Sequence, residues 1–257
     1  MGAFGVGQDQ AQWVATGYLA TMVIGMLLNS WLVAALGQRA TFLLIIAVFV
    51  VGSVVGAFAS SIDMLILSRV LQGVPAGVMQ PFCMMVNFQV FPPERRGTAM
   101  GIFGMGVVWA PVFGPLLGGI AIDTMGWRYI FAMPLPFIAV ALAMGPIFLP
   151  QKSVKAPLPK FDWTGLIILI TALGLILTAL TSGQRLGWLS DSVLGRGFLG
   201  IVAVTAFVWW EGKATRPLLD FSLFRNPRFA CAMGVSFIFG ICLFGSSYVV
   251  PVFAQTV

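Results

Sequence analysis

The sequence contains no histidine, which removes the commonest general base, proton shuttle and metal ligand from the available side chains. Only 8 residues are acidic, and they lie at the ends of apolar runs or between them, so no carboxylate cluster suits an enzyme active site. The cysteines Cys83, Cys231 and Cys242 lie inside apolar segments, which argues against a disulfide framework and a zinc site. We therefore expect neither an enzyme nor a metal site.

Charge is also scarce. Charged residues make up 9% of the sequence, whereas ordinary soluble domains contain about 25%. Apolar residues make up 59%, and the mean hydropathy is +0.99. These values predict an all-α integral membrane protein that crosses the bilayer several times.

Uncharged apolar runs predict eight transmembrane helices, each near the ~20 residues that a spanning helix needs. The runs cover residues 13–35, 40–60, 64–89, 98–120, 129–149, 163–182, 194–210 and 229–253.

Lys and Arg are concentrated in alternate joining segments. Ten of the 14 lie in one set: Arg39, Arg95, Arg96, Lys152, Lys155, Lys160, Lys213, Arg216, Arg225 and Arg228. By the positive-inside rule this set faces the cytoplasm. Both ends of the sequence would then lie outside the cytoplasm, which is unusual for a complete transporter, so we expect a fragment.

The third predicted helix carries a polar stripe, with residues spaced at three and four positions along one face. Its members are Arg69, Gln72, Ala76, Gln80, Cys83 and Asn87. A charged side chain inside a membrane helix is costly and by default marks a functional site. The alternative for Arg69 is that its guanidinium extends to the outer headgroups.

Asn29 is the notable buried amide of the first helix. We include it with Gln80 and Asn87 as candidates for a substrate cavity. The same face of the first helix carries Gly17, Thr21 and Gly25 at four-residue steps, a pattern more typical of helix packing than of binding.

The segment from Thr98 to Ile120 is the most informative part of the sequence. Small residues recur in it every four positions, so one face of the helix is open to close approach by another helix. Pro111 and Pro115 lie on the same helix, where neighbouring helices can satisfy the freed backbone groups. Such a segment indicates a bundle of helices that moves.

Several stretches together resemble the major facilitator superfamily, and within it the fourteen-helix drug:proton antiporters of the EmrB/QacA type. Leu67–Ala76, LSRVLQGVPA, is similar to the fourth-helix motif. Gly106–Gly119, GVVWAPVFGPLLGG, is similar to the fifth-helix antiporter motif, the most specific of the matches. Gly126–Phe131 resembles the entry to helix six, and residues 161–165, 183–188 and 216–220 resemble the helix pair inserted in the fourteen-helix branch.

The resemblance implies a major facilitator helical bundle with about eight of fourteen helices present, namely family helices two to nine. Residues 1–150 would form the N-terminal bundle without its first helix. Residues 151–228 would form a cytoplasmic hinge, the inserted helix pair and an amphipathic loop. Residues 229–257 would begin the C-terminal bundle.

The resemblance also implies site residues. Arg69 and Gln72 would take part in proton coupling. The antiporter motif, which would form a flexible packing seam, comprises Gly106, Ala110, Pro111, Gly114, Pro115, Gly118 and Gly119. Gly37 and Arg39 would belong to a gating loop, although Ala34 occupies its usual acidic position, which puts that latch in doubt.

The implied function is export of small amphipathic or cationic compounds, multidrug efflux, coupled to proton influx by alternating access. The alternatives are a truncated, non-transporting membrane protein of transporter ancestry and a related transporter for a metabolite. No cofactor is expected, because a proton gradient supplies the energy, and the proton-carrying carboxylate would lie on a missing helix. Expected partners are the lipid bilayer, drug-like substrates and protons, with a periplasmic adaptor left open and no nucleic acid. The expected location is the bacterial cytoplasmic membrane.

Overall fold

The computed structural model describes residues 8–151, 160–215 and 217–256, and these residues form helices and loops without a strand. The predicted hinge, Pro150 to Lys160, lies mostly outside the described residues. The elements are α1 (Gln8–Leu36), α2 (Gln38–Ala57), α3 (Ile62–Val90), η1 (Pro93–Arg95), α4 (Arg96–Met125), α5 (Tyr129–Ala132), α6 (Leu135–Phe148), α7 (Trp163–Leu186), α8 (Asp191–Glu211), η2 (Phe221–Arg225) and α9 (Pro227–Thr256).

Several helix ends follow directly from local sequence. Ser61 begins α3 by accepting a hydrogen bond of 3.2 Å from the backbone N–H of Met64. Asp162 caps α7 in the same way, with 2.9 Å from Oδ1 to the backbone nitrogen of Gly165. Gly37 alone separates α1 from α2, and its φ of 84° is a conformation that glycine adopts without strain.

In the described residues, seven helical spans are long and apolar enough to cross a membrane, and all seven correspond to predicted ones. The eighth predicted span corresponds to α9. Its part from Pro227 to Leu243 is apolar but shorter than the other seven spans. The span at 129–149 differs from expectation because it is divided into α5 and α6. Pro134 lies at this division and has no N–H to donate to the preceding turn.

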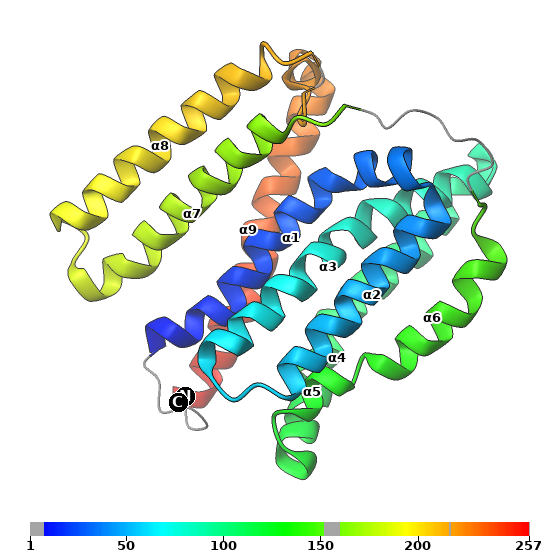
Figure 1. Cartoon of the computed structure of the whole chain (residues 1–257), viewed down its shortest axis with the longest axis horizontal. Helices are drawn as coiled ribbons and strands as arrows, with labels where there is room; N and C mark the ends of the chain where they lie inside the picture. Colours follow the sequence, from blue (N-terminus) through cyan, green and yellow to red (C-terminus); the bar gives the residue numbers. More distant parts are fainter. Residues whose placement is uncertain (1–7, 152–159, 216, 257) are drawn as a thin grey trace.

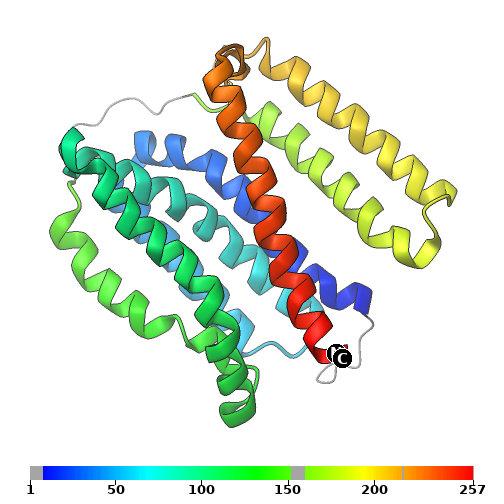
Figure 2. The ribbon, with the colours of Figure 1, turned by 180° about the vertical axis from the view of Figure 1, so that it is seen from behind.

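The helices form two groups joined along α1 (Figure 1). On one side α3 packs between α1 and α2, and α6 lies beyond α2. On the other side α7 and α8 form an antiparallel hairpin that contacts α1 through α7. Seen from behind, α4 runs over the back of the first group, and α9 runs over α1 where the two groups meet (Figure 2).

Glycines allow α1 and α3 to approach each other backbone to backbone. A β-carbon on Gly25 would collide with the carbonyl oxygen of Val74, and one on Gly77 would collide with that of Met22. Gly73 lies equally close to Thr21. The interpretation of the small face on α1 as a packing surface is therefore confirmed.

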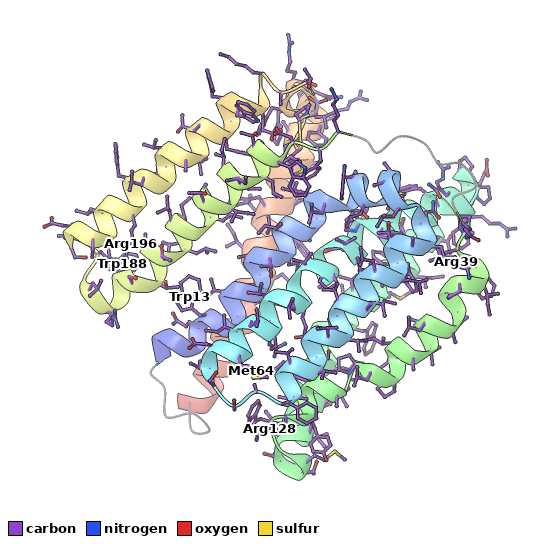
Figure 3. All side chains as sticks on the ribbon, viewed as in Figure 1. Trp13, Arg39, Met64, Arg128, Trp188 and Arg196 are labelled. Carbon is purple, nitrogen blue, oxygen red and sulfur yellow. The ribbon has the colours of Figure 1, made fainter. Side chains whose placement is uncertain are left out.

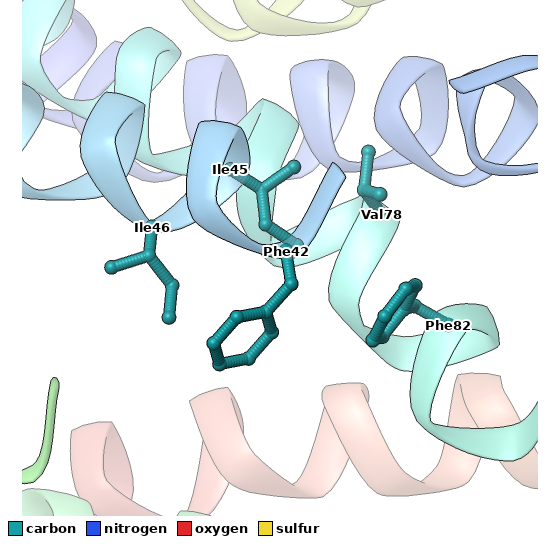
Figure 4. Close-up of a cluster of buried hydrophobic side chains, with 5 residues drawn as sticks. All are labelled: Phe42, Ile45, Ile46, Val78 and Phe82. Atoms are coloured by element: carbon teal, nitrogen blue, oxygen red, sulfur yellow. The ribbon is translucent and has the colours of Figure 1, made fainter. Parts of the chain in front are cut away.

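An apolar cluster fills the contact between α2 and α3 toward the end of the bundle at which α2 begins (Figure 4). Phe42 and Phe82 stack with their ring centroids 6.2 Å apart, and Val78 is fully buried beside them. Gly145 of α6 lies against the Phe42 ring, so a side chain there would displace it. This apolar core thus holds α2, α3 and α6 together.

The charged side chains agree with the predicted alternation of loops. Arg39 lies at one end of the helices, whereas Arg128 and Arg196 lie toward the opposite end (Figure 3). The first end is the one that the charge pattern assigns to the cytoplasm.

Candidate functional site

Arg69 and Gln72, predicted from their spacing, lie together in a network that joins α3 to α2. Nη1 of Arg69 donates to Oε1 of Gln72 over 3.3 Å. Nε2 of Gln72 then donates to Oγ of Ser53 on α2 over 2.9 Å. Gln72 is 2% exposed and Ser53 1%, so this hydrogen bond is closed off from the surroundings.

Two further helices contact the Arg69 side chain. Its guanidinium carbon lies 4.7 Å from the ring centroid of Phe131 on α5, a cation–π distance. The phenol of Tyr18 on α1 is close enough to interact with the Arg69 charge. Residues from α1, α2, α3 and α5 therefore converge on one half-buried cation.

Sequence reasoning missed Ser53, Phe131 and Tyr18. The only signal for Ser53 was its place between Gly52 and Gly56 in an apolar run, where small residues mark a close helix contact. In the structure Gly52 lies against Gln72, and Gly56 lies against the Phe131 ring. These two glycines let α2 come near enough for Ser53 to reach the network.

Asn29, Gln80 and Asn87 lie in three different environments. Asn29 is 5% exposed, and its Oδ1 has no hydrogen-bond partner among the described residues. Gln80 is exposed, and Asn87 is half-buried. Their shared role in a substrate cavity stays a prediction.

An apolar cavity of about 340 Å³ lies beside the stripe, between α2, α3 and α6. Ala76, the stripe residue one turn beyond Gln72, forms part of its wall. Phe49, Met79 and Phe137 are among the other lining residues. The cavity could hold an apolar group within two turns of the Arg69 network.

The antiporter motif lies on α4, which remains one continuous helix through Gly106–Gly119. A β-carbon on Gly106, Gly114, Gly118 or Gly119 would have no atom within 4 Å. Ala110 and Pro115 are exposed, and the side chain of Pro111 lies outside the described part. The face is therefore open in the described chain, and its predicted role as a packing seam stays a prediction.

Gly37 and Arg39 lie at the junction of α1 and α2, next to the end of α6. Gln151 lines one small pocket with Gly37 and another with Arg39. Gln38, between them, donates from Nε2 to Oε1 of Gln89 on α3. This amide pair links the junction to α3.

The Arg69 network can stabilise a negative charge or orient a hydrogen-bonding group, but it holds no carboxylate of its own among residues 8–151, 160–215 and 217–256. The same residues contain no group of three or more His, Cys, Asp or Glu side chains that could hold a metal ion.

Comparison with known proteins identifies the family. A profile described as "Major Facilitator Superfamily" matches residues 1–257. The chain belongs to this superfamily. With its apolar spans, this makes it a multi-pass membrane protein of a transporter family.

Several relatives are named for drug resistance. The chain is 30% identical over 258 residues to "Multidrug export protein EmrB" of Haemophilus influenzae, covering 100% of this chain and 50% of the relative. It is 32% identical to a "Multidrug resistance protein B homolog" of Mycobacterium tuberculosis, covering 99% and 47%. It is 30% identical to the "Uncharacterized MFS-type transporter YhcA" of Bacillus subtilis, covering 99% and 48%. The chain thus spans about half the length of these curated relatives.

Proposed function

We propose that this protein is part of a secondary active exporter of small amphipathic or cationic compounds, driven by proton influx through alternating access. The support is twofold. Several relatives carry multidrug names, and an ionisable side chain, Arg69, lies in a polar network inside the membrane-spanning bundle. The proposed location is a bacterial cytoplasmic membrane.

The observation that carries the proposal is the link from Arg69 through Gln72 to Ser53. Placing a cationic side chain among membrane helices costs free energy. Such side chains are therefore rare, are usually paired with polar groups, and by default mark functional sites. Gln72 fixes one edge of the guanidinium, and Phe131 covers its face. In this proposal these two contacts hold the side chain inside the bundle, in place of the outer headgroups.

In this proposal Arg69 acts on a proton-carrying carboxylate that the described residues do not contain. A guanidinium within about 4–6 Å of a carboxylate favours the charged form of that carboxylate. Movement of α3 relative to its neighbours would change this distance. The carboxylate would then release its proton in one conformation and bind it in the other.

The apolar cavity beside Ala76 is the proposed contact for the substrate's apolar part. Its lining is aliphatic and aromatic, which suits permissive binding of amphipathic compounds. The open glycine face of α4 is proposed as the surface on which a moving helix packs. An adaptor protein remains an optional partner.

The test is ethidium transport into inverted membrane vesicles from cells that express the protein. Arg69→Ala is expected to abolish proton-driven transport at unchanged membrane abundance, and Arg69→Lys to restore part of it by retaining the charge. The matched control is Arg196→Ala. Arg196 also donates to a neutral side chain, Oγ of Ser182, over 3.1 Å, but Arg196 lies on α8 and outside the Arg69 network. Wild-type transport by Arg69→Ala, or equal losses in both alanine variants, would overturn the proposal.

A further inference from the structure

The Arg69 network lies close to the outer ends of α2 and α3. Ser53 is about one helical turn before the end of α2, and Arg69 is about two turns after the start of α3. Figure 3 shows Met64, in the first turn of α3, and Arg128 at the same end of the bundle. This is the end that the charge pattern places outside the cytoplasm. Water from the outside therefore has only a short distance to cover before it reaches the network.

Phe131 of α5 lies on the outer side of this network. Its ring packs against Gly56 so closely that a β-carbon on Gly56 would collide with it. Gly56 follows Ser53 by three residues on α2, so it lies about 4.5 Å nearer the outer end. The same ring covers the guanidinium of Arg69 at 4.7 Å, and Phe131 is 3% exposed. The ring is therefore positioned between the Ser53–Gln72 hydrogen bond and the outer end.

Arg128 fixes this position of the ring. Its Nη2 donates to the backbone oxygen of Ala59 over 3.2 Å, and Ala59 is fully buried in the loop between α2 and α3. Arg128 directly precedes α5, and its own carbonyl oxygen accepts from the Phe131 backbone N–H over 3.2 Å. The guanidinium carbon also lies 4.5 Å from the ring centroid of Trp127. Arg128 thus joins the loop to the turn of backbone that carries Phe131.

The helix that carries Phe131 is a short, separate piece. α5 comprises four residues, Tyr129–Ala132, and Pro134 lies between it and α6. Because proline has no N–H to donate, α5 and α6 are less tightly coupled than two halves of a continuous helix. The position of Phe131 therefore depends on local contacts of α5, among which the hydrogen bond from Arg128 to Ala59 ties it to the end of α2.

We propose that Phe131, held in position by Arg128, closes the Arg69 network to water from the outer side. Exclusion of water strengthens the interaction of a charge with its polar neighbours, because the local dielectric constant is then low. An open network would give water, and with it protons, a route to Arg69 from the outside. As a barrier in proton coupling this inference rests on the proposed function, whereas the closure is a property of the fold. Arg128 acts through Phe131 and is a positioning residue.

The test measures how fast a thiol inside the network reacts with a reagent added outside. Ser53→Cys introduces the thiol in a chain that also carries Cys83→Ala, Cys231→Ala and Cys242→Ala. Right-side-out membrane vesicles are treated with (2-sulfonatoethyl) methanethiosulfonate, which does not cross membranes and whose negative charge is attracted to Arg69. Mass spectrometry of the purified protein then gives the labelled fraction against time.

The first expected result needs no change at Phe131. The thiol at position 53 should react more slowly, by roughly tenfold or more, than a thiol introduced by Ser60→Cys, because Ser53 is buried and Ser60 is exposed in the outer loop. Equal rates at the two positions would overturn the proposal. Absence of labelling at position 60 would place this end of the bundle in the cytoplasm and would overturn it as well.

The second expected result is faster labelling at position 53 when the ring or its anchor is removed. Arg128→Gln should raise the rate about tenfold, as loss of one charge-assisted hydrogen bond would. Phe131→Ala should raise it by at least as much, since it removes the ring itself. Phe131→Leu should give a rate between those of Phe131→Ala and the intact ring, because leucine fills part of the space. A rate in Phe131→Ala equal to that with the ring intact would contradict the closure.

The matched controls are Tyr129→Ala and Arg196→Gln. Tyr129 is an aromatic residue on the same short helix, but it is 52% exposed. Arg196 also lies toward the outer end, but it donates to Ser182 in the α7–α8 hairpin. Neither should change the rate at position 53, and a rise in Tyr129→Ala as large as that in Phe131→Ala would overturn the proposal. Because labelling does not measure transport, the closure and the proposed export activity can each fail without the other.

Discussion

The close contact between α1 and α3 predicts that Gly77 tolerates no side chain. A methyl group on Gly77 would overlap the carbonyl oxygen of Met22, and it would lie 2.7 Å from that residue's carbonyl carbon. Both are backbone atoms of α1, so the strain cannot be relieved by rotating a side chain. Overpacking of this kind costs about 1–3 kcal/mol.

Gly77→Ala also changes the intrinsic preference for helix, which favours alanine by roughly 1 kcal/mol. Gly174→Ala isolates that effect, because Gly174 lies inside α7 and a β-carbon there would have no atom within 4 Å. The difference in stability between the two variants is then the cost of the clash. At roughly 2–4 °C per kcal/mol, Gly77→Ala should melt about 2–12 °C below Gly174→Ala.

The assay is thermal denaturation of the purified protein in detergent, followed by the fraction that elutes as a monodisperse peak after heating. Both variants are compared at one detergent and lipid concentration. Equal melting temperatures would refute the backbone contact between α1 and α3. A lower melting temperature for Gly174→Ala would also refute it, because the open position would then be the more crowded one.

Two further predictions use the same thermal assay. Gln72→Leu removes the hydrogen bonds of Gln72 to the Ser53 hydroxyl and to the Arg69 guanidinium, and should cost about 0.6–1.7 kcal/mol, the range found for polar contacts between membrane helices. Adding Ser53→Ala should recover part of this loss, and a further additive loss would contradict the hydrogen bond. Gly114→Ala should change the melting temperature of this chain by about as much as Gly174→Ala does, because its face of α4 is also open and only the helix preference changes; destabilisation as large as that of Gly77→Ala would show that another helix packs there.

The helices could be predicted because a membrane span requires a long apolar run, and charged loops separate such runs clearly in this sequence. The division between α5 and α6 was missed, although Pro134 stands at it. Hydropathy does not register such a break, because the residues on both sides remain apolar. The lengths of the helices beyond the apolar runs also depend on capping residues such as Asp162, which hydropathy does not register.

Two of the five residues in the Arg69 network followed from spacing alone. Arg69 and Gln72 are three residues apart on one helix, so their contact is local. Ser53 and Phe131 come from other helices, and their contacts depend on how closely the glycines at 52 and 56 let these helices pack. Periodicity places residues on a face but does not say which helix that face meets, which is also why Gln80 could be grouped with Gln72 although only Gln72 is buried.

The central claim is that Arg69 couples proton movement to export, and it is tested most directly by measuring both fluxes at once. The protein is reconstituted into liposomes with a pH-sensitive dye inside, and a substrate gradient of tetraphenylphosphonium is imposed. The account predicts that the wild type moves protons in response to the substrate gradient, and that Arg69→Ala abolishes this movement while substrate exchange between equal concentrations continues. Substrate-driven proton movement of wild-type size in Arg69→Ala would contradict it.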